Sequence, residues 1–396
     1  MNNDPASRLQ KTLTTGQFKG VNTAITDSAT FAFDDAYAMT DCFQGKSEGA
    51  FLYSRHWNPT SIALTNALAA MENTESAWVT GSGMAAITSA ILQICNTGDH
   101  IVSSVTTYGG TFAFLKNYLP KFNIDVSCVD ITDLDAVKAA IRPTTRIIYT
   151  ESITNPLLQV SDIPALSEIA KENKLKLLVD NTFTPMMINP TELGADVTLY
   201  SMTKFINGKN DCVAGAICGS SEFINELIDV NTGTCMLLGP ALDPIRASSI
   251  HKNLFTLHIR MQKHSRNAAY IAGKMDRQGL KVNYPGLSRH PQHELLKKIM
   301  NPAYGFGGLL SIDVGSTEKA NKLMVGMQDK GIGYLAVSLG YFKTLFSNSS
   351  SSTSSEVPGD VQDKMGLSRG LVRFSVGLDH DIEQTWETIE AILSDI

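Results

Sequence analysis

The segment LYSMTKFINGKND (199–211) combines two hydroxyl side chains with a lysine. Ser201 and Thr203 lie two positions apart at the end of a predicted strand, so their hydroxyls point the same way, and Lys204 follows at once. Two hydroxyl donors beside an amine suit a phosphate bound next to an aldehyde. A lysine forms a Schiff base only as a neutral amine, which burial or nearby cations promote. A strand end followed by a surface lysine gives the same pattern, so this motif alone leaves both interpretations open.

A second segment predicts an anion site. Residues 79–92, VTGSGMAAITSAIL, form the pattern of a strand, a glycine-rich turn and a helix. The start of such a helix leaves backbone N–H groups free and directs the positive end of its dipole at an anion, so we expect a phosphate there. A dinucleotide motif, G-x-G-x-x-G, needs glycine where this chain has Ala86. Because alanine is tolerated at that position, a nicotinamide site is an alternative.

Two further side chains follow predicted strands. Asp180 ends the apolar run 175–180, at the edge of an open sheet where ligands collect. A carboxylate there would keep a pyridine nitrogen protonated and make the ring an electron sink, although capping of the next helix is a common use of aspartate. Tyr108 follows the apolar run 100–105, and its ring would stack on a flat cofactor. A core or surface tyrosine is the alternative interpretation.

The elements that must position these residues come from hydrophobic periodicity. Short apolar runs predict strands at 76–80, 100–105, 124–129, 146–152, 175–180, 196–201 and 213–219. Amphipathic patterns between them predict helices at 83–95, 134–141 and 163–173. Strand and helix in turn predict an α/β domain with a mostly parallel sheet covered on both faces.

The rest of the chain predicts a smaller α+β domain. Residues 243–277 are helical in pattern, strands are expected at 308–314, 333–339 and 371–376, and helices at 317–328 and 380–394. We therefore predict an N-terminal arm over a partner subunit at 1–58, a large domain at 59–250 and a C-terminal domain at 251–396. The serine-rich stretch 346–360 has the composition of a disordered linker.

Composition limits the partners. The chain has 396 residues, 33 basic against 39 acidic, and a net charge of −6, which disfavours binding to nucleic acid or to an anionic membrane. The N-terminus lacks a signal pattern and no apolar run reaches about 18 residues, so we expect a cytoplasmic protein without a membrane span. Six cysteines without a C-x-x-C pair predict structural thiols. Eight histidines without ligand spacing predict no metal site.

Taken together, six segments resemble the pyridoxal-phosphate (PLP) enzymes of cysteine and methionine metabolism. They are YSRHWNPT (53–60), GSGMAAI (81–87), VDNTF (179–183), SMTKFINGKND (201–211), VSLG (337–340) and LVRFSVGL (371–378). That family includes methionine γ-lyase, the cystathionine lyases, cystathionine γ-synthase and O-acetylhomoserine sulfhydrylase. The resemblance covers about residues 15–396 and implies the PLP-dependent transferase fold of type I, which is aspartate aminotransferase-like.

The resemblance also implies how the cofactor, pyridoxal 5′-phosphate, is held. Lys204 would be the Schiff-base lysine, Asp180 the partner of the ring nitrogen, and Tyr108 the stacking residue that also assists the leaving group. The expected phosphate donors are the backbone N–H groups of Gly83 and Met84, the hydroxyls of Ser201 and Thr203, and, across a subunit boundary, Tyr53 and Arg55. The dimer would then be the smallest complete catalytic unit, and the resemblance implies a homotetramer.

The substrate carboxylate would be gripped by Arg373, helped by Asn155 and by the backbone near Ser338. A planar guanidinium suits this bidentate task better than an amine. The implied reaction is γ-elimination from a γ-substituted L-amino acid such as methionine, a homoserine derivative or canavanine, which releases a 2-oxo acid and ammonia. A γ-replacement enzyme, such as a sulfhydrylase or cystathionine γ-synthase, is the alternative. More distant alternatives are a nicotinamide oxidoreductase and a relative that binds but does not turn over.

Departures from the family pattern concern the distal part of the substrate. Val337 stands where cystathionine-handling relatives usually have an acidic residue, which favours a methionine-like or acetylhomoserine-like side chain. Gly110 stands where methionine γ-lyases generally have a cysteine, which puts strict methionine specificity in doubt. Lys343 replaces a common glutamate in the segment 340–358. We hypothesise that this segment, with His56, Trp57 and Tyr341, reshapes the distal pocket for an O-linked or polar tail; a tolerated loop change is the alternative.

Overall fold

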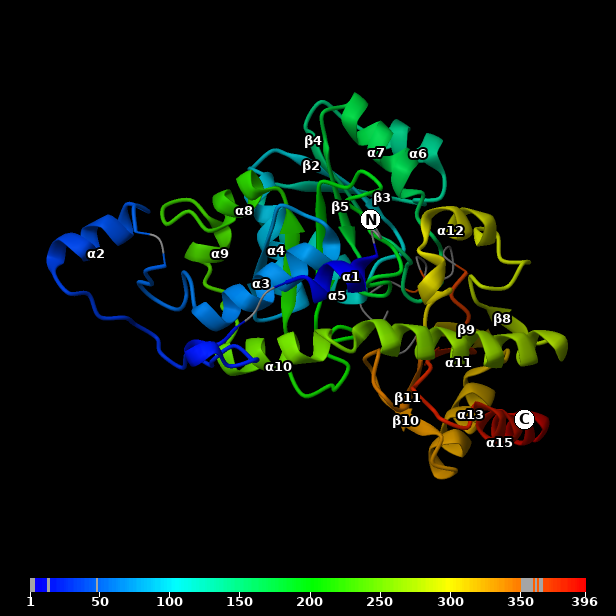
Figure 1. The fold of residues 1–396 in the computed structure, drawn as a ribbon. Helices are drawn as coiled ribbons and strands as arrows, with labels where there is room; N and C mark the ends of the chain where they lie inside the picture. Colours follow the sequence, from blue (N-terminus) through cyan, green and yellow to red (C-terminus); the bar gives the residue numbers. More distant parts are fainter. Residues whose placement is uncertain (1–3, 13–14, 48, 350–358, 360–361, 363–365) are drawn as a thin grey trace.

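Two β-sheets organise the chain in the computed structural model, which describes residues 4–12, 15–47, 49–349, 359, 362 and 366–396 (Figure 1). The larger sheet has seven strands in the order β1-β7-β6-β5-β4-β2-β3. Its strands are β1 (Ser76–Thr80), β2 (His100–Ser104), β3 (Asp125–Val129), β4 (Thr145–Glu151), β5 (Lys176–Asp180), β6 (Val197–Ser201) and β7 (Gly215–Gly219). Only β7 runs antiparallel to its neighbours, so the predicted mostly parallel sheet is confirmed.

Helices cover both faces of this sheet, as predicted for strands that are apolar on both sides. One face packs against α3 (Pro59–Glu72), α6 (Leu134–Ala140), α7 (Ile163–Glu172) and α10 (Pro244–Leu254). The opposite face packs against α4 (Gly83–Ile94), α8 (Ser221–Leu227), α9 (Thr234–Leu237), η2 (Phe114–Tyr118) and η3 (Leu119–Phe122). Along β5, Leu178 enters the second core and Val179 the first, because successive side chains of a strand point to opposite faces.

Local capping fixes where the helices begin. Ser82 accepts a hydrogen bond from the backbone N–H of Ala85 at 3.0 Å and so starts α4. Asp162 does the same for Ala165 at 3.1 Å at the start of α7. Serine and aspartate are favoured at this position because they satisfy helix N–H groups that have no partner within the helix. The strand-to-helix turns that carry the site are therefore set by short-range sequence.

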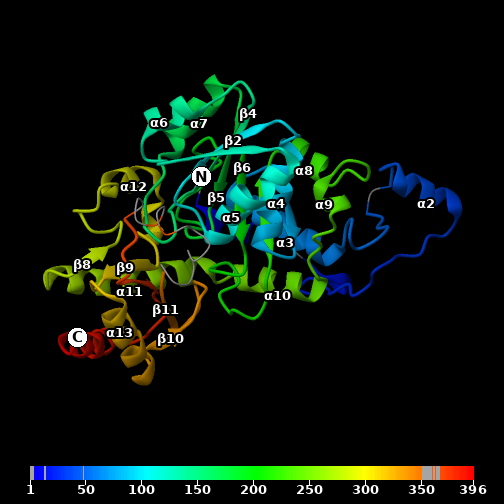
Figure 2. The same ribbon diagram turned by 180° about the vertical axis from the view of Figure 1, so that it is seen from behind.

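The smaller sheet has five strands in the order β10-β11-β12-β9-β8. They are β8 (Lys281–Asn283), β9 (Leu309–Asp313), β10 (Gly333–Leu335), β11 (Thr344–Asn348) and β12 (Leu371–Ser375). Its core is shared with α11 (Leu257–Arg277), α13 (Thr317–Asp329) and α15 (Ile382–Ser394). The first part of α11 packs in the core of the large sheet and its later part in this one, so α11 links the two units (Figures 1 and 2).

Three expectations need correction, and one strand, β8, was not predicted. Residues 346–348 belong to β11, pair with β12 and are buried, so this part of the serine-rich stretch is no linker; residues 350–358 and 360 lie outside the described residues. The predicted strand 333–339 ends at Leu335, because the chain turns through Ser338 at a φ of 97°. The helical region 243–277 is interrupted between α10 and α11. β8, with three residues, is too short to give a periodic signal.

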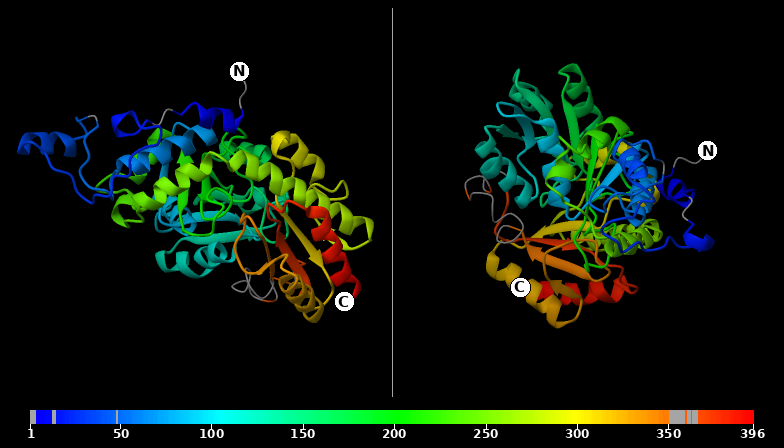
Figure 3. Two further views of the ribbon diagram at one scale, coloured as in Figure 1. Left: turned by 60° about the horizontal axis from the view of Figure 1, so that its bottom comes forward. Right: turned by 90° about the vertical axis from the view of Figure 1, so that its left-hand side faces the viewer.

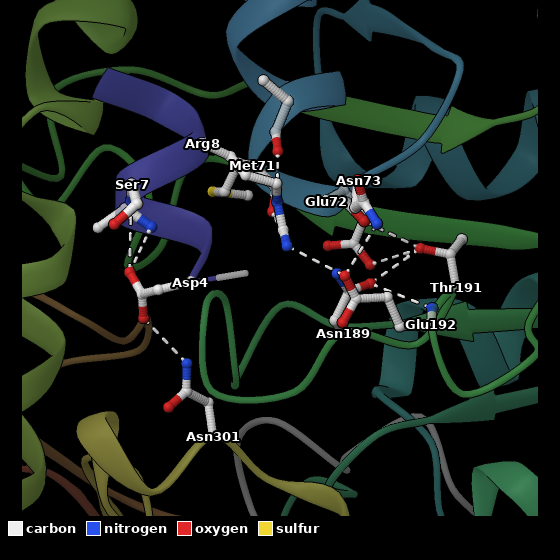
Figure 4. Close-up of polar contacts among 12 residues, drawn as sticks. Asp4, Ser7, Arg8, Met71, Glu72, Asn73, Asn189, Thr191, Glu192 and Asn301 are labelled. Carbon is white, nitrogen blue, oxygen red and sulfur yellow. Dashed lines mark hydrogen bonds and ion pairs between the residues drawn. The ribbon is translucent and has the colours of Figure 1, made fainter. Parts of the chain in front are cut away.

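The N-terminal segment behaves as two parts. Helix α1 (Pro5–Gln10) packs on its own chain, where Arg8 donates hydrogen bonds to the backbone oxygens of Ala70 and Met71, both at 2.9 Å, and pairs with Glu192 at 3.0 Å (Figure 4). Asp4 accepts a hydrogen bond from Asn301 at 3.0 Å (Figure 4). These contacts place a cation at the negative end of α3. Residues 4–10 therefore dock on the body of their own chain.

Helix α2 (Ala36–Phe43) differs, because it buries no residue and lies far from the body of the molecule (Figures 1 and 3). The prediction of an arm thus fits this later part of residues 1–58 in shape, and its contact with a partner subunit stays a prediction. Among the described residues, no helix combines the length and the apolar character that crossing a membrane requires. All six cysteines have free thiols.

Candidate active site

A cavity of about 430 Å³ lies where the carboxyl ends of the large-sheet strands meet the smaller sheet. It is lined by every residue that the sequence predicted for cofactor or substrate except Tyr53 and Arg55: Gly83, Met84, Tyr108, Asn155, Asp180, Ser201, Thr203, Lys204, Ser338 and Arg373. Ligands in open α/β sheets collect at this edge. The structure therefore brings together in space residues that are scattered along the chain.

Lys204 follows β6 and points toward the smaller sheet. Its Nζ donates a hydrogen bond to Ser338 Oγ at 3.1 Å, and Ser338 Oγ in turn donates to Asn210 Oδ1 at 3.1 Å. Burial, with the charge of Arg373 adding, lowers the pKa of Lys204 to about 8. A substantial fraction of this amine is therefore neutral near neutral pH, which nucleophilic and proton-transfer chemistry both need.

The start of α4 forms one end of the cavity. The N–H groups of Gly83 and Met84 lie in its first turn, where backbone donors have no partner within the helix. A Cβ atom on Gly83 would lie 2.6 Å from Ser201 Cβ, so only glycine allows this close approach of helix and strand. Within the described part of the chain Ser201 Oγ has no hydrogen-bond partner, whereas Thr203 Oγ1 accepts a hydrogen bond from Ala214 N at 3.0 Å and donates one to Ala214 O at 3.3 Å. The arrangement suits a phosphate.

Asp180 ends β5, is buried and lines the cavity. Its Oδ1 accepts hydrogen bonds from the backbone N–H and the hydroxyl of Thr182, at 3.0 and 2.5 Å. Burial raises the pKa of Asp180, and the two hydrogen bonds from Thr182 oppose that rise. A buried carboxylate of this kind is stabilised by a cation, such as a protonated ring nitrogen. The alternative role of Asp180 as a helix cap is not observed.

Arg373 lies in β12 with 2% of its surface exposed. Its guanidinium donates to Asn155 Oδ1 at 3.0 Å and to the backbone oxygen of Ser338 at 3.3 Å, while its buried Nε has no hydrogen-bond partner. Among the described residues no carboxylate forms an ion pair with Arg373, and burial lowers its pKa to about 10. A buried cation without an anion suits a substrate carboxylate.

Tyr108 lines the cavity, with 43% of its surface exposed, and its stacking on the cofactor stays a prediction. A Cβ atom on Gly110 would lie 2.7 Å from Cε1 of the Tyr108 ring. The glycine at this position therefore gives the ring room that a larger residue, such as the cysteine expected in methionine γ-lyases, would take away. The departure noted in the sequence thus has a local packing consequence for the residue that covers the cofactor site.

The sequence interpretation missed Glu151, the last residue of β4. Glu151 lines the cavity, is buried, and lies directly beside Asp180 in the register of β4 and β5. The signal for it was present, because Glu151 follows the apolar run beginning at residue 146 just as Asp180 follows its own run. Carboxyl ends of neighbouring parallel strands meet at one edge, so the argument that selected Asp180 applied equally to Glu151.

The mouth of the cavity is apolar. Val213 and Val337 line it, and each has 61% of its surface exposed. Val337, the position at which the sequence pattern predicted the distal contact, therefore lies at the exposed edge of the cavity. His56, Trp57 and Tyr341 do not line the cavity of their own chain; Trp57 packs edge-on against Trp78, with ring centroids 4.8 Å apart. The hypothesis that they reshape the distal pocket gains no support within one chain.

Tyr53 and Arg55 also lie away from the cavity of their own chain. Arg55 donates a hydrogen bond to the backbone oxygen of Met236 at 2.7 Å and lies over the Tyr53 ring, 5.8 Å from its centroid. Tyr53 has 44% of its surface exposed. These two residues therefore cannot reach a phosphate in the cavity of the same chain as they stand.

Comparison with known proteins decides the family. Residues 8–391 match the family described as "Cys/Met metabolism PLP-dependent enzyme". The chain belongs to this family. The PLP interpretation of the phosphate cup and of Lys204 is thereby favoured over the nicotinamide one. The α/β fold expected from the resemblance is confirmed by solved structures of PLP-dependent enzymes of fold type I.

Relatives within the family differ in their named activities. Methionine γ-lyase of Arabidopsis thaliana is 46% identical over 95% of this chain and 86% of its own length. O-succinylhomoserine sulfhydrylase of Pseudomonas aeruginosa is 35% identical over 90% and 87%. A crystal structure of cystathionine γ-lyase from Lactobacillus plantarum, complexed with L-serine, has a TM-score of 0.89 at 28% identity and covers 98% of this chain and 99% of its own.

The residues present fit pyridoxal 5′-phosphate. The Campylobacter jejuni structure described as an O-acetylhomoserine (thiol)-lyase carries N′-pyridoxyl-lysine-5′-monophosphate and superposes with a TM-score of 0.92 at 26% identity, over 99% of this chain and 100% of its own. In this chain, the close approach at Gly83 opens a cradle at the start of α4, and the amine of Lys204 has a lowered pKa. With Asp180 as a buried anion, the cavity offers partners for a phosphate, an aldehyde and a ring nitrogen.

Proposed function

We propose that this chain catalyses γ-elimination from a γ-substituted L-amino acid. For L-methionine, the reaction consumes one water and yields 2-oxobutyrate, methanethiol and ammonia; a homoserine derivative or canavanine would lose its own γ-substituent. The observation that carries the proposal is the meeting, in one cavity, of the Lys204 amine, the Asp180 carboxyl and the unpaired Arg373 cation, beneath an apolar mouth. Membership of the family and the 46% identity to a methionine γ-lyase support it.

The proposed roles follow from these positions. Gly83, Met84, Ser201 and Thr203 would hold the phosphate of pyridoxal phosphate, Asp180 its ring nitrogen, and Lys204 its aldehyde carbon. When bound, the cofactor supplies an electron sink for the pair of electrons left at the α carbon of the substrate. Tyr108 would cover its ring.

The chain's own groups then orient the substrate and move its protons. Arg373, with Asn155 beside it, holds the substrate carboxylate and so fixes the α C–H bond relative to Lys204. Lys204, as a neutral amine, accepts the proton from the α carbon of the substrate. After releasing that proton, it would accept one from the β carbon. Tyr108 lines the cavity and is partly exposed, and its hydroxyl would deliver a proton to the departing sulfur or oxygen.

The distal contacts favour an uncharged side chain. Val337 and Val213 offer no anionic partner to a second ammonium, which would stay in water at this exposed mouth, whereas a thioether can pack against their apolar side chains. We therefore expect methionine-like side chains to be preferred over cystathionine. We also expect the enzyme not to be strictly specific for methionine. Gly110 has no side chain against the Tyr108 ring, so the ring has room to move.

A γ-replacement reaction is the second candidate, because the O-succinylhomoserine sulfhydrylase relative shares 35% identity over nearly the whole chain. The first half of both reactions uses the same residues. The second half differs only in whether a thiol adds before the product leaves.

A substrate panel tests the proposal. Purified enzyme would be given methionine, cystathionine, O-acetylhomoserine and canavanine, each with and without an added thiol, and 2-oxo acid, ammonia and released thiol would be measured together. We expect 2-oxobutyrate from methionine without an added thiol, at a higher kcat/KM than from cystathionine. Product formation that requires the added thiol would instead establish replacement.

The assembly and location are proposed on separate grounds. Because Tyr53 and Arg55 lie outside the cavity of their own chain, we propose that they serve the phosphate of a neighbouring subunit in a homodimer, with pairs of dimers forming a tetramer. The exposed helix α2 and its neighbouring segments are available for this contact. We propose a cytoplasmic location, which the six free thiols support.

A further inference from the structure

Glu151 uses both of its carboxyl oxygens to bind backbone N–H groups at the edge of the cavity. Oε1 accepts a hydrogen bond from Tyr108 N at 2.6 Å, and Oε2 accepts one from Asn155 N at 2.9 Å. The side chain is buried, with 5% of the residue exposed. Glu151 therefore lines the cavity, but both of its carboxyl oxygens already accept hydrogen bonds from the backbone of the protein.

The two N–H groups belong to different loops with different tasks. Tyr108 lies in the turn between β2 and α5 (Gly109–Ala113), and its ring covers the cavity. Asn155 lies in the loop after β4, and its Oδ1 accepts from Arg373 Nη1 at 3.0 Å. The Glu151 carboxyl therefore binds the backbone both of Tyr108, whose ring would stack on the cofactor, and of Asn155, which contacts the guanidinium of Arg373.

The electrostatic environment of Glu151 includes a second buried carboxyl, that of Asp180. Glu151 and Asp180 are register partners in adjacent parallel strands, which lie about 4.8 Å apart. Burial first, and then the charge of Asp180, raise the pKa of Glu151 to about 8. The two backbone N–H groups bound by Glu151 oppose this rise in its pKa, as the two hydrogen bonds from Thr182 do for Asp180.

We propose that Glu151 is a positioning residue that fixes Tyr108 and Asn155 relative to each other, so that ring stacking and the grip on the substrate carboxylate depend on one side chain. This inference rests on the proposed function for the tasks of Tyr108 and Asn155. The competing explanation is that Glu151 only satisfies two buried amides and stabilises the fold. The two explanations differ in ligand binding, since only the first ties Glu151 to the carboxylate grip.

Binding of an unreactive amino acid separates them. L-norleucine has the chain length of methionine but no leaving group, so its Kd for the holoenzyme can be read from the change in cofactor absorption. Glu151→Ala removes both acceptors, and we expect Kd to rise about 30-fold or more, with weaker binding of pyridoxal phosphate to the apoenzyme. Glu151→Gln has the same size but a single acceptor oxygen, so we expect an increase of about three- to tenfold.

Glu72→Gln is the matched control. Glu72 is likewise a buried carboxyl, and burial raises its pKa to about 7, but it accepts hydrogen bonds from Tyr200 and Thr198 and does not line the cavity. We expect this variant to change the melting temperature while its Kd for L-norleucine stays within about twofold of wild type. A shift in Kd of the size seen for Glu151→Gln would overturn the proposal, because general loss of stability would then suffice.

A double-mutant cycle tests the coupling directly. If Glu151 acts through Asn155, Asn155→Ala must cost much less norleucine affinity in the Glu151→Gln background than in wild type. Additive effects, or a Kd for Glu151→Gln equal to that of wild type, would overturn the proposal even if Glu151→Ala failed to fold. These are binding measurements, so they stand apart from the proposed function, which fails instead if wild-type enzyme releases no 2-oxo acid from any substrate tested.

Discussion

Two causes lower the pKa of Lys204. Desolvation by the surrounding protein is the larger cause, and the guanidinium of Arg373 is the second. Ser338 accepts a hydrogen bond from the amine without supplying a charge. Arg373, the residue proposed to bind the substrate carboxylate, therefore also lowers the pKa of Lys204. A bound carboxylate would neutralise the charge of Arg373 and so weaken this effect.

The pH dependence of amine labelling tests this environment. In the apoenzyme, acetylation of Lys204 by acetic anhydride requires the neutral amine, whose fraction grows as pH rises. We expect labelling, followed by mass spectrometry, to reach half its maximum near pH 8, the pKa of Lys204, rather than near the usual lysine value of about 10.4. Arg373→Met removes one cause of the lowering, so its midpoint should lie higher. A wild-type midpoint near pH 10 would contradict the account.

Val337 sets the preference at the mouth of the cavity. Val337→Glu would place an anion where the distal ammonium of cystathionine must lie, and we expect the ratio of kcat/KM for cystathionine over methionine to rise about three- to fivefold. The gain is modest because the site is exposed. Val337→Gln has nearly the same shape without the charge and should leave the ratio unchanged; an equal rise in both variants would rule out the electrostatic explanation.

Single residues differ in how far the sequence predicts them. Asp180 and Lys204 carry local signals, because each follows a predicted strand and has side chains of matching chemistry beside it. Arg373 and Asn155 became site residues only through the family resemblance, since their contact joins positions 218 apart in the chain. Glu151 needed the register of β4 and β5 before its pairing with Asp180 could be seen.

At the scale of elements, the close contact of α4 with β6 shapes the phosphate end of the site. Gly83→Ala would place a Cβ atom 2.6 Å from Ser201 Cβ and 2.9 Å from Ser201 Cα, so the helix start must move away from the strand. We expect the Kd for pyridoxal phosphate to rise about tenfold or more, measured by titration of the apoenzyme.

Gly273→Ala is the control for that substitution. Gly273 lies inside α11, where an added Cβ would meet nothing closer than Arg277 Nη1 at 3.8 Å. Alanine is the better helix former by about 1 kcal/mol, so this variant should gain stability and keep its cofactor affinity. If Gly83→Ala bound pyridoxal phosphate as tightly as Gly273→Ala, the cradle at the start of α4 would not be the phosphate site.

The elements themselves were predictable where periodicity and caps agree. The strands of the large sheet and the helix at 83–94 follow from apolar runs and from a serine before the first turn. β11 could not be predicted from local sequence, because its last residues belong to a serine-rich stretch. The average composition of residues 346–360 is polar, although Phe346 within it is buried. Tertiary pairing with β10 and β12, which no local pattern records, makes that segment a strand.

At the scale of the whole molecule, the cavity belongs to two units at once. Lys204 and Asp180 come from the large sheet, Arg373 and Ser338 from the smaller one, and α11 links the cores of both. Tyr53 and Arg55, the predicted phosphate ligands, remain outside. If the proposed sharing between subunits holds, no single chain carries a complete site.

Subunit complementation tests this sharing. Lys204→Ala and Arg55→Ala chains, each expected to be nearly inactive alone, would be mixed in equal amounts, unfolded and refolded. In a mixed dimer one site has both native residues, so about a quarter of wild-type activity should return under random pairing. Mixing Lys204→Ala with Asp180→Ala is the control, because one chain supplies both residues to the same site, so each site of the mixed dimer carries one change and no activity should return. No gain of activity in the first mixture would contradict the sharing.

The most direct measurement concerns Lys204 itself. Enzyme loaded with pyridoxal phosphate would be reduced with borohydride, digested and examined by mass spectrometry. The account predicts that the added cofactor mass is found on the peptide containing Lys204, and that Lys204→Ala lacks both this peptide adduct and the cofactor's absorption band near the visible edge. Cofactor mass on another lysine, with Lys204 unmodified, would contradict it.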